Sequence, residues 1–269
     1  MLRLPAVAGR FYPSNTEELT AQVRRYAAAD SKEKTRVVKA CLVPHAGYMY
    51  SGHVAGAVFA CMTLPRKFIV LGVRHQPRGE AAAVLSNGAW RTPLGDAAID
   101  EELAKELKEA CPQLREDSVA HSAEHSLEVQ IPFLQVLTEK FTFVPIALGT
   151  VRFEELTRIG EGIGKVLSKA SEKVLLLTTS DLNHYEDDAT TRVKDAKAVE
   201  QLLAMNASGL YETCWKEQIS MCGLGPAVAM LTALKEMGGA KAEVVKYATS
   251  ADVSNDRETV VGYVGMIFE

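Results

Sequence analysis

Short apolar runs alternate with longer segments of helical period along most of this chain, and this alternation constrains the fold more than any other feature. The runs lie at residues 37–43, 68–71, 141–148 and 174–179. They are rich in leucine or β-branched residues and apolar at consecutive positions, as strands covered on both faces tend to be. We therefore expect them to form the inner strands of one sheet.

Segments with the helical spacing of apolar residues lie between and after these runs, at residues 53–62, 101–110, 126–137, 153–170, 193–204 and 225–237. Alternating strands and helices favour an α/β fold, a layered sheet flanked by helices. Residues 242–248 and 260–268 are both strand-like, and the polar, turn-rich segment between them predicts a long hairpin. Because no repeat or linker divides the sequence, we expect a single domain over residues 1–269.

The charge balance argues against two classes of partner. The chain has 34 acidic residues and 30 Lys and Arg, a net charge of -4, which gives no electrostatic reason to expect nucleic acid or an anionic membrane. No apolar run is long enough to span a bilayer, and the N-terminus lacks the apolar stretch of a secretory signal. We expect a soluble, cytoplasmic protein whose partners are small molecules or other proteins.

Three of the six histidines stand where an expected strand runs out into a loop. His45 follows Val43-Pro44, His75 follows Leu71-Gly72, and His184 comes shortly after the run that ends at residue 179. In open α/β sheets, ligands bind in the crevice beyond the carboxyl ends of the strands, so these side chains can converge there. The placement predicts a site for a metal or for proton transfer.

Cys222 is the cysteine that we single out. It lies just ahead of the expected helix 225–237, whose N-terminus would lower the pKa of its thiol and favour the thiolate. The other cysteines are scattered and form no CxxC pair, which argues against disulfides and a zinc ribbon. We expect them to be small buried hydrophobes: Cys41, Cys61, Cys111 and Cys214.

Two imidazoles and one thiolate, from His45, His75 and Cys222, could hold a divalent metal and leave a position open for water or substrate. These three ligands alone do not determine which metal binds. Iron would make redox chemistry natural, zinc would favour activation of water, and copper would tolerate the same donors. The alternative for each histidine is a structural hydrogen bond to a nearby carbonyl.

Two acid and imidazole pairs are candidates for proton transfer. Asp181 and His184 stand three residues apart after a strand, with a helix cap as the alternative for Asp181. His125 and Glu128 share one face if residues 126–137 form a helix, with capping of that helix as the alternative. His53 and His121 have no such context, so we expect structural or solvated side chains there.

The chain closely resembles the Memo family, through motifs that occur in order over almost its whole length. They are Ala8-Gly9-Arg10-Phe11-Tyr12-Pro13, Pro44-His45-Ala46-Gly47-Tyr48, Gly72-Val73-Arg74-His75 at the end of an expected strand, Arg91-Thr92-Pro93-Leu94-Gly95, Glu124-His125-Ser126-Leu127-Glu128, Ser180-Asp181-Leu182-Asn183-His184 and Met221-Cys222-Gly223. The resemblance implies one α/β domain similar to the LigB-type class III extradiol dioxygenases. The family's metal ligands fall here on His45, His75 and Cys222.

The implied ligand set departs from that of the dioxygenases, which bind Fe(II) with two histidines and a carboxylate. A thiolate in the third place weakens the case for aromatic ring cleavage, and a fold does not transfer a function. Prokaryotic members of the family are grouped with AMMECR-type and radical-SAM proteins in the AmmeMemoRadiSam system, which makes those proteins candidate partners.

We expect a metal-dependent oxidoreductase with Fe(II), or else copper, at His45, His75 and Cys222. Asp181, His184, His125 and Glu128 would then serve as its proton-transfer or pocket residues. The alternatives are a non-enzymatic module that binds a metal or a peptide on the same fold, and a zinc hydrolase.

Overall fold

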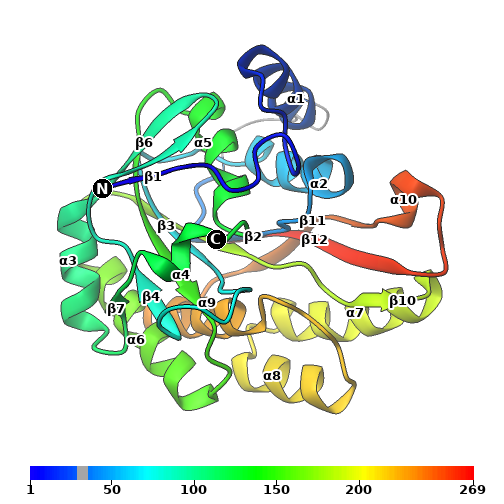
Figure 1. The fold of residues 1–269 in the computed structure, drawn as a ribbon. Coiled ribbons are helices and arrows are strands. Elements are labelled where there is room, and N and C mark those ends of the chain that lie inside the picture. The colour runs from blue at the N-terminus through cyan, green and yellow to red at the C-terminus, as the bar shows by residue number, and fades with distance from the viewer. Residues whose placement is uncertain (29–35) are drawn as a thin grey trace.

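The computed structural model of this protein describes residues 1–28 and 36–269. Within them, twelve strands form a large sheet that helices cover on both faces (Figure 1), which confirms the expected α/β fold. The strands are β1 (Leu2–Arg3), β2 (Ala40–Val43), β3 (Lys67–Val73), β4 (Ala82–Val84), β5 (Ala89–Thr92), β6 (Gly95–Ile99), β7 (Arg115–Glu116), β8 (Thr142–Leu148), β9 (Val174–Thr179), β10 (His184–Glu186), β11 (Ala242–Thr249) and β12 (Val260–Phe268).

The order and direction of the central strands determine where their carboxyl ends lie. The strand order is β1-β5-β6-β8-β3-β9-β2-β12-β10, while β11 pairs with β12 and β4 pairs with β8 and β7. Strands β8, β3, β9 and β2 run parallel, with Val73 opposite Leu148 and Val43 opposite Thr179. Their carboxyl ends therefore meet at one edge, where the loops that carry His45, His75 and Asp181 begin.

Both faces of these central strands are buried, which explains their consecutive apolar residues. In β3, Ile69 and Leu71 pack into the core on one face of the sheet, and Phe68 and Val70 pack into the core on the other. All four side chains are fully buried. Since successive residues of a strand point to opposite faces, a strand covered by helices on both sides has no polar face.

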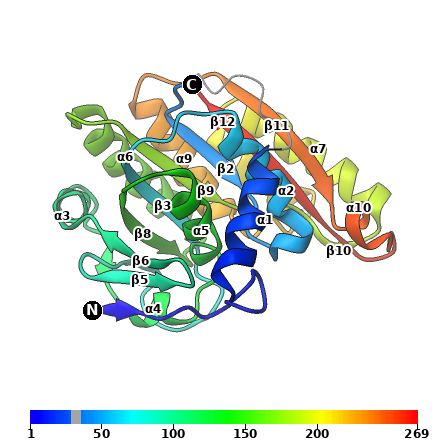
Figure 2. The ribbon, with the colours of Figure 1, turned by 90° about the horizontal axis from the view of Figure 1, so that it is seen from above.

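The helices divide into two layers. Helices α1, α2 and α5 pack on one face, with α2 against β11 and β12 and with α1 packed on α2 and α5 (Figure 2), and helices α3, α6, α7, α8 and α9 pack on the other. The helices are α1 (Thr16–Ala28), α2 (Tyr48–Ala60), α3 (Glu101–Ala110), α4 (Val119–Ser122), α5 (Ile131–Leu137), α6 (Phe153–Lys169), α7 (Asp188–Leu203), α8 (Ala207–Lys216), α9 (Leu224–Glu236) and α10 (Ala251–Ser254), with a 3₁₀ turn η1 (Glu128–Gln130). None of them is both long and apolar enough to cross a membrane.

Several elements differ from the expectation. The C-terminal hairpin of β11 and β12 is confirmed, but the short helix α10 lies in its connection. Helices α1 and α8 and the hairpin of β5 and β6 were not expected. In place of the expected helix 126–137, the structure has the 3₁₀ turn η1 followed by α5, which starts only at Ile131. Pro132 lies in the first turn of α5, where a helix does not need the backbone N–H that proline lacks.

Candidate metal centre

His45 is held by the strand that neighbours its own. It lies two residues after β2, and its ring Nδ1 is 2.9 Å from the hydroxyl of Thr179, at the end of β9. Its backbone N–H donates to Asp181 Oδ1 at 2.8 Å. The side chain is 1% exposed, and its Nε2 lies 3.1 Å from the sulfur of Cys222. The ring is therefore fixed with its second nitrogen facing the thiol.

His75 is held by Glu124, a residue that sequence reasoning did not single out. The Glu124 carboxylate lies 2.9 Å from His75 Nδ1 and accepts from the backbone N–H of His75 at 2.7 Å and of Ser126 at 2.7 Å. Burial alone would raise the pKa of Glu124, but the hydrogen bond and charge of His75 lower it to about 2. The ionised carboxylate orients the imidazole and leaves Nε2 free to bind a metal.

Cys222 completes a group of three. It lies in the loop before α9, and its sulfur accepts from the backbone N–H of Asp181 at 3.3 Å. One ligand atom from each of His45, His75 and Cys222 lies within 4.8 Å of the others. The structure thus brings together three residues far apart in sequence, at the carboxyl edge of the sheet.

The expectation that the helix N-terminus lowers the pKa of the Cys222 thiol is wrong for the metal-free protein. Burial raises the pKa of its thiol well above the usual range, and the charge of Asp181 raises it further. Backbone hydrogen bonds from Asp181 and Gly223 act in the opposite direction but do not outweigh burial. Loss of solvent disfavours the charged thiolate, and a buried thiol of this kind gives up its proton most readily when a cation takes the place of that proton.

His125 lies inside the same group of rings. Its imidazole stacks on that of His75 with ring centroids 4.4 Å apart, and its centroid is 5.6 Å from that of His45. Burial, followed by the charges of His45 and His75, lowers the pKa of His125 to about 4. His125 is therefore neutral at physiological pH, and its surroundings oppose protonation of the ring.

Glu128 does not form the expected pair with His125. Its carboxylate is fully buried and accepts from Arg3 Nη1, from the Tyr12 hydroxyl at 2.6 Å, and from the backbone N–H groups of Ala6 and Val7. The carboxylate nearest to His125 is instead Glu124, 3.7 Å from its Nδ1. The 3₁₀ turn and these N-terminal donors direct Glu128 away from the histidines, so it anchors the N-terminal segment.

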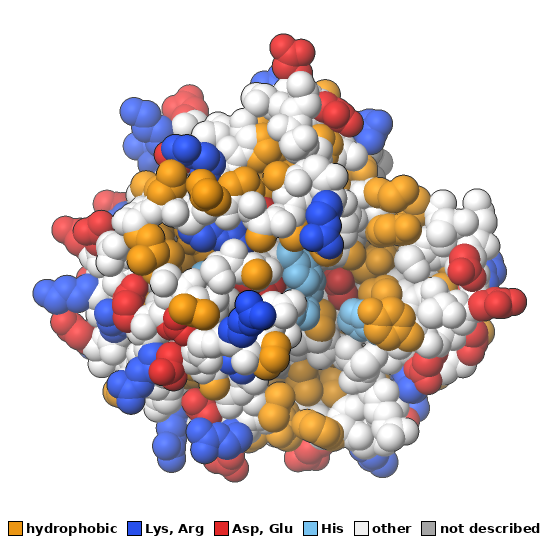
Figure 3. Space-filling model, viewed as in Figure 1, with side chains coloured by type: hydrophobic (Ala, Val, Ile, Leu, Met, Phe, Trp, Pro, Cys, Tyr) orange, Lys and Arg blue, Asp and Glu red, His pale blue; other side chains and the backbone are white. Residues whose placement is uncertain are grey.

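Asp181 and His184 form a second group with Cys222. One ligand atom from each of these three residues lies within 4.8 Å of the others. Asp181 Oδ2 is 4.0 Å from His45 Nε2, and burial raises the pKa of Asp181. The buried Nδ1 of His184 has no hydrogen-bond partner among the described residues. On the surface, histidine side chains line a hollow in the face shown in Figure 3.

His121 lies apart from this group. Its fully buried ring contacts Trp90, with centroids 5.7 Å apart, and burial lowers its pKa to about 4. Its backbone carbonyl accepts from Arg3 Nε at 3.1 Å. These contacts belong to the packing of the N-terminal segment.

The fold and the site define an α/β protein with a candidate metal centre of two histidines and one cysteine. A family profile described as Memo-like protein matches residues 3–267. A MEMO1 family protein of Methanopyrus kandleri is 37% identical over 100% of this chain and 99% of its own length. One from Archaeoglobus fulgidus is 40% identical over 99% of each. The chain belongs to the Memo family, as its motifs indicate.

One solved structure extends the comparison to distant proteins. An uncharacterized protein from Escherichia coli K12 matches with a TM-score of 0.57 and 10% identity, over 86% of this chain and 100% of that chain. This likeness concerns the fold alone. The narrower expectation of a LigB-type fold stays a prediction.

The assignment of Glu128 to packing rather than to the metal centre can be tested by Glu128→Gln. Removing the charge leaves the buried Arg3 without its carboxylate partner, which should lower the free energy of unfolding by about 3 kcal/mol or more. Denaturant unfolding measures this change. The exposed pair of Arg91 and Asp96 supplies the control, since Asp96→Asn should leave the midpoint almost unchanged. Unchanged stability with lost metal binding would instead place Glu128 at the centre.

Proposed function

We propose that this protein is a metal-dependent oxidoreductase that acts on a small molecule, with iron as its metal and copper as the alternative, held by His45, His75 and Cys222. The observation that carries the proposal is the convergence of these three ligand groups within 4.8 Å. Dioxygenase-like chemistry at such a site rests on the family resemblance and belongs to the same proposal.

The donor set fits a transition metal. Thr179 and Glu124 occupy the Nδ1 side of the two imidazoles, so each ring can offer Nε2, and the neutral imidazole is the form that binds metal. Burial lowers the pKa of His45 well below its usual value, which keeps that ring neutral. Imidazole and thiolate donors suit iron, copper and zinc rather than magnesium or calcium.

Bound iron or copper would supply one-electron chemistry, and the chain's own groups would manage the protons. His125 is neutral and stacked on His75, so its ring nitrogens can donate or accept a hydrogen bond beside the centre. Asp181 holds a proton to higher pH than an exposed aspartate does, because it is buried. Ionisable groups beside the ligands, with His125 next to His75 and Asp181 next to His45, favour an oxidoreductase over a module that only stores a metal.

Cys222→Ser should weaken the binding of Fe(II) or its spectroscopic substitute Co(II) by roughly a hundredfold or more, because it removes a direct ligand. The matched control is Cys214→Ser, a buried cysteine outside the ligand group, which should leave the affinity within about twofold. Titration of the metal-free protein measures both affinities. The thiolate-to-Co(II) charge-transfer absorption band should be absent only in the Cys222 variant.

Two results would contradict the proposal. Equal affinities in the two cysteine variants would remove Cys222 from the centre. Tight iron or copper binding with no oxygen uptake in the presence of ascorbate would favour the non-enzymatic binding module.

Metal binding should release about one proton per ion at pH 7 to 8, because the thiol of Cys222 is protonated there while His45 is already neutral. Because the pKa of the thiol is raised, the affinity for the metal should rise about tenfold per pH unit until that pKa is reached. Calorimetry in buffers of different ionisation enthalpy counts the protons. No proton release in wild type would mean that the thiol is not a ligand.

A further inference from the structure

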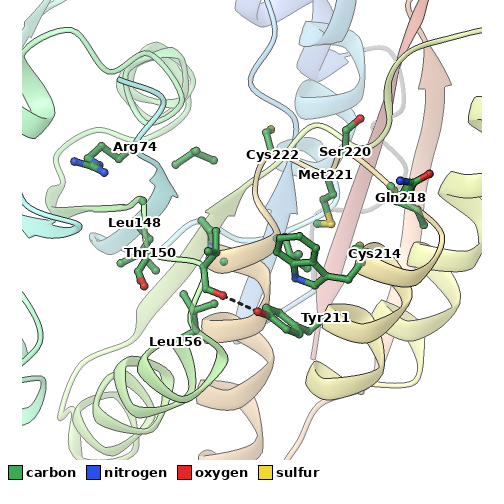
Figure 4. A pocket seen from close by; sticks show the side chains of 18 residues that line it. Arg74, Leu148, Thr150, Leu156, Tyr211, Cys214, Gln218, Ser220, Met221 and Cys222 are labelled. Carbon is green, nitrogen blue, oxygen red and sulfur yellow. Dashed lines mark hydrogen bonds between the residues drawn. The ribbon is translucent and has the colours of Figure 1, made fainter. Parts of the chain in front are cut away.

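A cavity of about 560 Å³ lies beyond the carboxyl ends of β3 and β8. The start of α6, helix α8 and the loop before α9 enclose it (Figure 4). Its size falls within the range of pockets that hold small organic ligands. Of the three ligand residues of the candidate centre, only Cys222 lines this cavity. The cavity is therefore a second site beside the centre and not the space between its ligand groups.

Arg74 is the one charged residue among the described residues that line the cavity. No lysine, histidine, aspartate or glutamate accompanies it there, and it forms no ion pair with an acidic residue that the structure describes. A cation in such surroundings gains from an anion that the protein itself does not supply. The charge of Arg74 therefore favours a ligand with a negative charge.

One side of the Arg74 guanidinium is held by the protein, and the other side has no partner. Its Nη1 donates to the carbonyls of Gly79 at 2.7 Å and of Arg78 at 3.4 Å. Its buried Nε has no hydrogen-bond partner among the described residues. Gly149, another residue of the cavity wall, lies directly beside Nε and Nη2, and an added Cβ there would overlap the guanidinium. The unpartnered edge therefore lies at the wall, where glycine leaves room for it.

The edge formed by Nε and Nη2 of a guanidinium matches the two oxygens of a carboxylate. Two other arginines of this chain show the pairing. Nε and Nη2 of Arg91 donate to the two carboxylate oxygens of Asp96 at 2.7 and 2.9 Å, and those of Arg36 donate to Glu269 at 3.0 Å each. Arg74 has the same edge without such a partner, and a buried N–H left unpaired costs free energy. A ligand carboxylate would satisfy it.

The rest of the wall is predominantly apolar. Aliphatic side chains come from the ends of two strands, from α6 and from the loop before α9: Val73, Leu148, Leu156, Ile219 and Met221. One cation balances one negative charge, whereas a phosphate dianion would bring a second charge to a wall that has no partner for it. The wall therefore favours a monocarboxylate with a nonpolar body over a phosphate or a dicarboxylate.

Aromatic residues of α8 form the wall at the opposite end from Arg74, as Figure 4 shows for Tyr211. The Tyr211 hydroxyl donates to the carbonyl of Val151 at 2.7 Å, which fixes the ring. The ring centroid of Trp215 lies 6.1 Å from that of Tyr211, and Trp215 is 59% exposed. A fixed aromatic surface suits the nonpolar body of a ligand whose charged end lies at Arg74.

We propose that this cavity binds a small monocarboxylate, with the carboxylate paired to Nε and Nη2 of Arg74 and the nonpolar body lying toward Tyr211 and Trp215. The inference goes beyond the proposed function and does not rest on the metal centre. It assigns a class of ligand to a site that the metal ligands do not define.

Three probes separate the contribution of the charge from that of the nonpolar surface. Cyclohexanecarboxylate and cyclohexylmethanol have nearly the same shape and differ in charge, while acetate keeps the charge without the ring. By calorimetry near neutral pH, we expect cyclohexanecarboxylate to bind at least about tenfold more tightly than either of the others. Only two tryptophans are present, and Trp90 is fully buried, so a change in fluorescence on binding reports Trp215.

Arg74→Met removes the charge and the donors but keeps a long side chain. It should weaken cyclohexanecarboxylate about tenfold or more, while cyclohexylmethanol should stay within about twofold and so show that the cavity is still formed. Gly149→Ala should also weaken the carboxylate, because its Cβ displaces the guanidinium. Arg158→Met is the matched control, at an exposed arginine of α6 outside the cavity, and should change neither affinity by more than about twofold.

Equal binding of the carboxylate and the alcohol, or a carboxylate affinity that both Arg74→Met and Gly149→Ala leave unchanged, would overturn the inference. Titration of the metal-loaded and the metal-free protein keeps this result separate from the proposed function. Carboxylate binding that persists in the metal-free protein supports the cavity whether or not the metal centre is correct. Binding that is lost with the metal would overturn the inference and place the carboxylate at the metal.

Discussion

Two buried carboxylates hold the loops that follow the central strands, and the candidate centre depends on them. Glu124 binds both the backbone and the ring of His75, while Asp181 accepts from the backbone of His45 and donates its own N–H to the sulfur of Cys222. The parallel sheet brings these loops to one edge. The carboxylates then fix the loops that carry the ligands, so the ligand groups face one another.

This arrangement also defines the electrostatics of the hollow. His45 and His125 are kept neutral by burial, while Glu124 is kept ionised by its hydrogen bonds. A buried carboxylate without a cationic partner is costly, so burial raises the pKa of Asp181. A divalent cation would offset the negative charge and displace the thiol proton of Cys222, so metal binding and the stability of the loops should be linked.

The sequence was informative where one local rule decided the outcome. Strands buried on both faces leave consecutive apolar residues, and His45 and His75 follow two such strands. Helix α1 also has a local signal in the sequence: Asn15 accepts from the N–H of Glu18, and Leu19 and Val23 repeat at helical spacing. Its start could have been predicted from the capping residue.

Other features depend on contacts between distant residues. The partner of Glu124 lies 49 positions away, and Glu128 is captured by Arg3, 125 positions away. No spacing rule distinguishes a glutamate that orients a ligand from one that anchors a terminus. The raised pKa of the Cys222 thiol could not be predicted either. A helix N-terminus can be recognised in a sequence, whereas the burial of one side chain cannot.

The central claim is that two imidazoles and one thiolate share a metal ion. X-ray absorption of iron-loaded protein tests it most directly. The account predicts one sulfur scatterer at about 2.3 Å and nitrogen scatterers near 2.1 Å, with the sulfur lost in Cys222→Ser and kept in Cys214→Ser. A coordination shell of oxygen and nitrogen without sulfur in the wild type would contradict it.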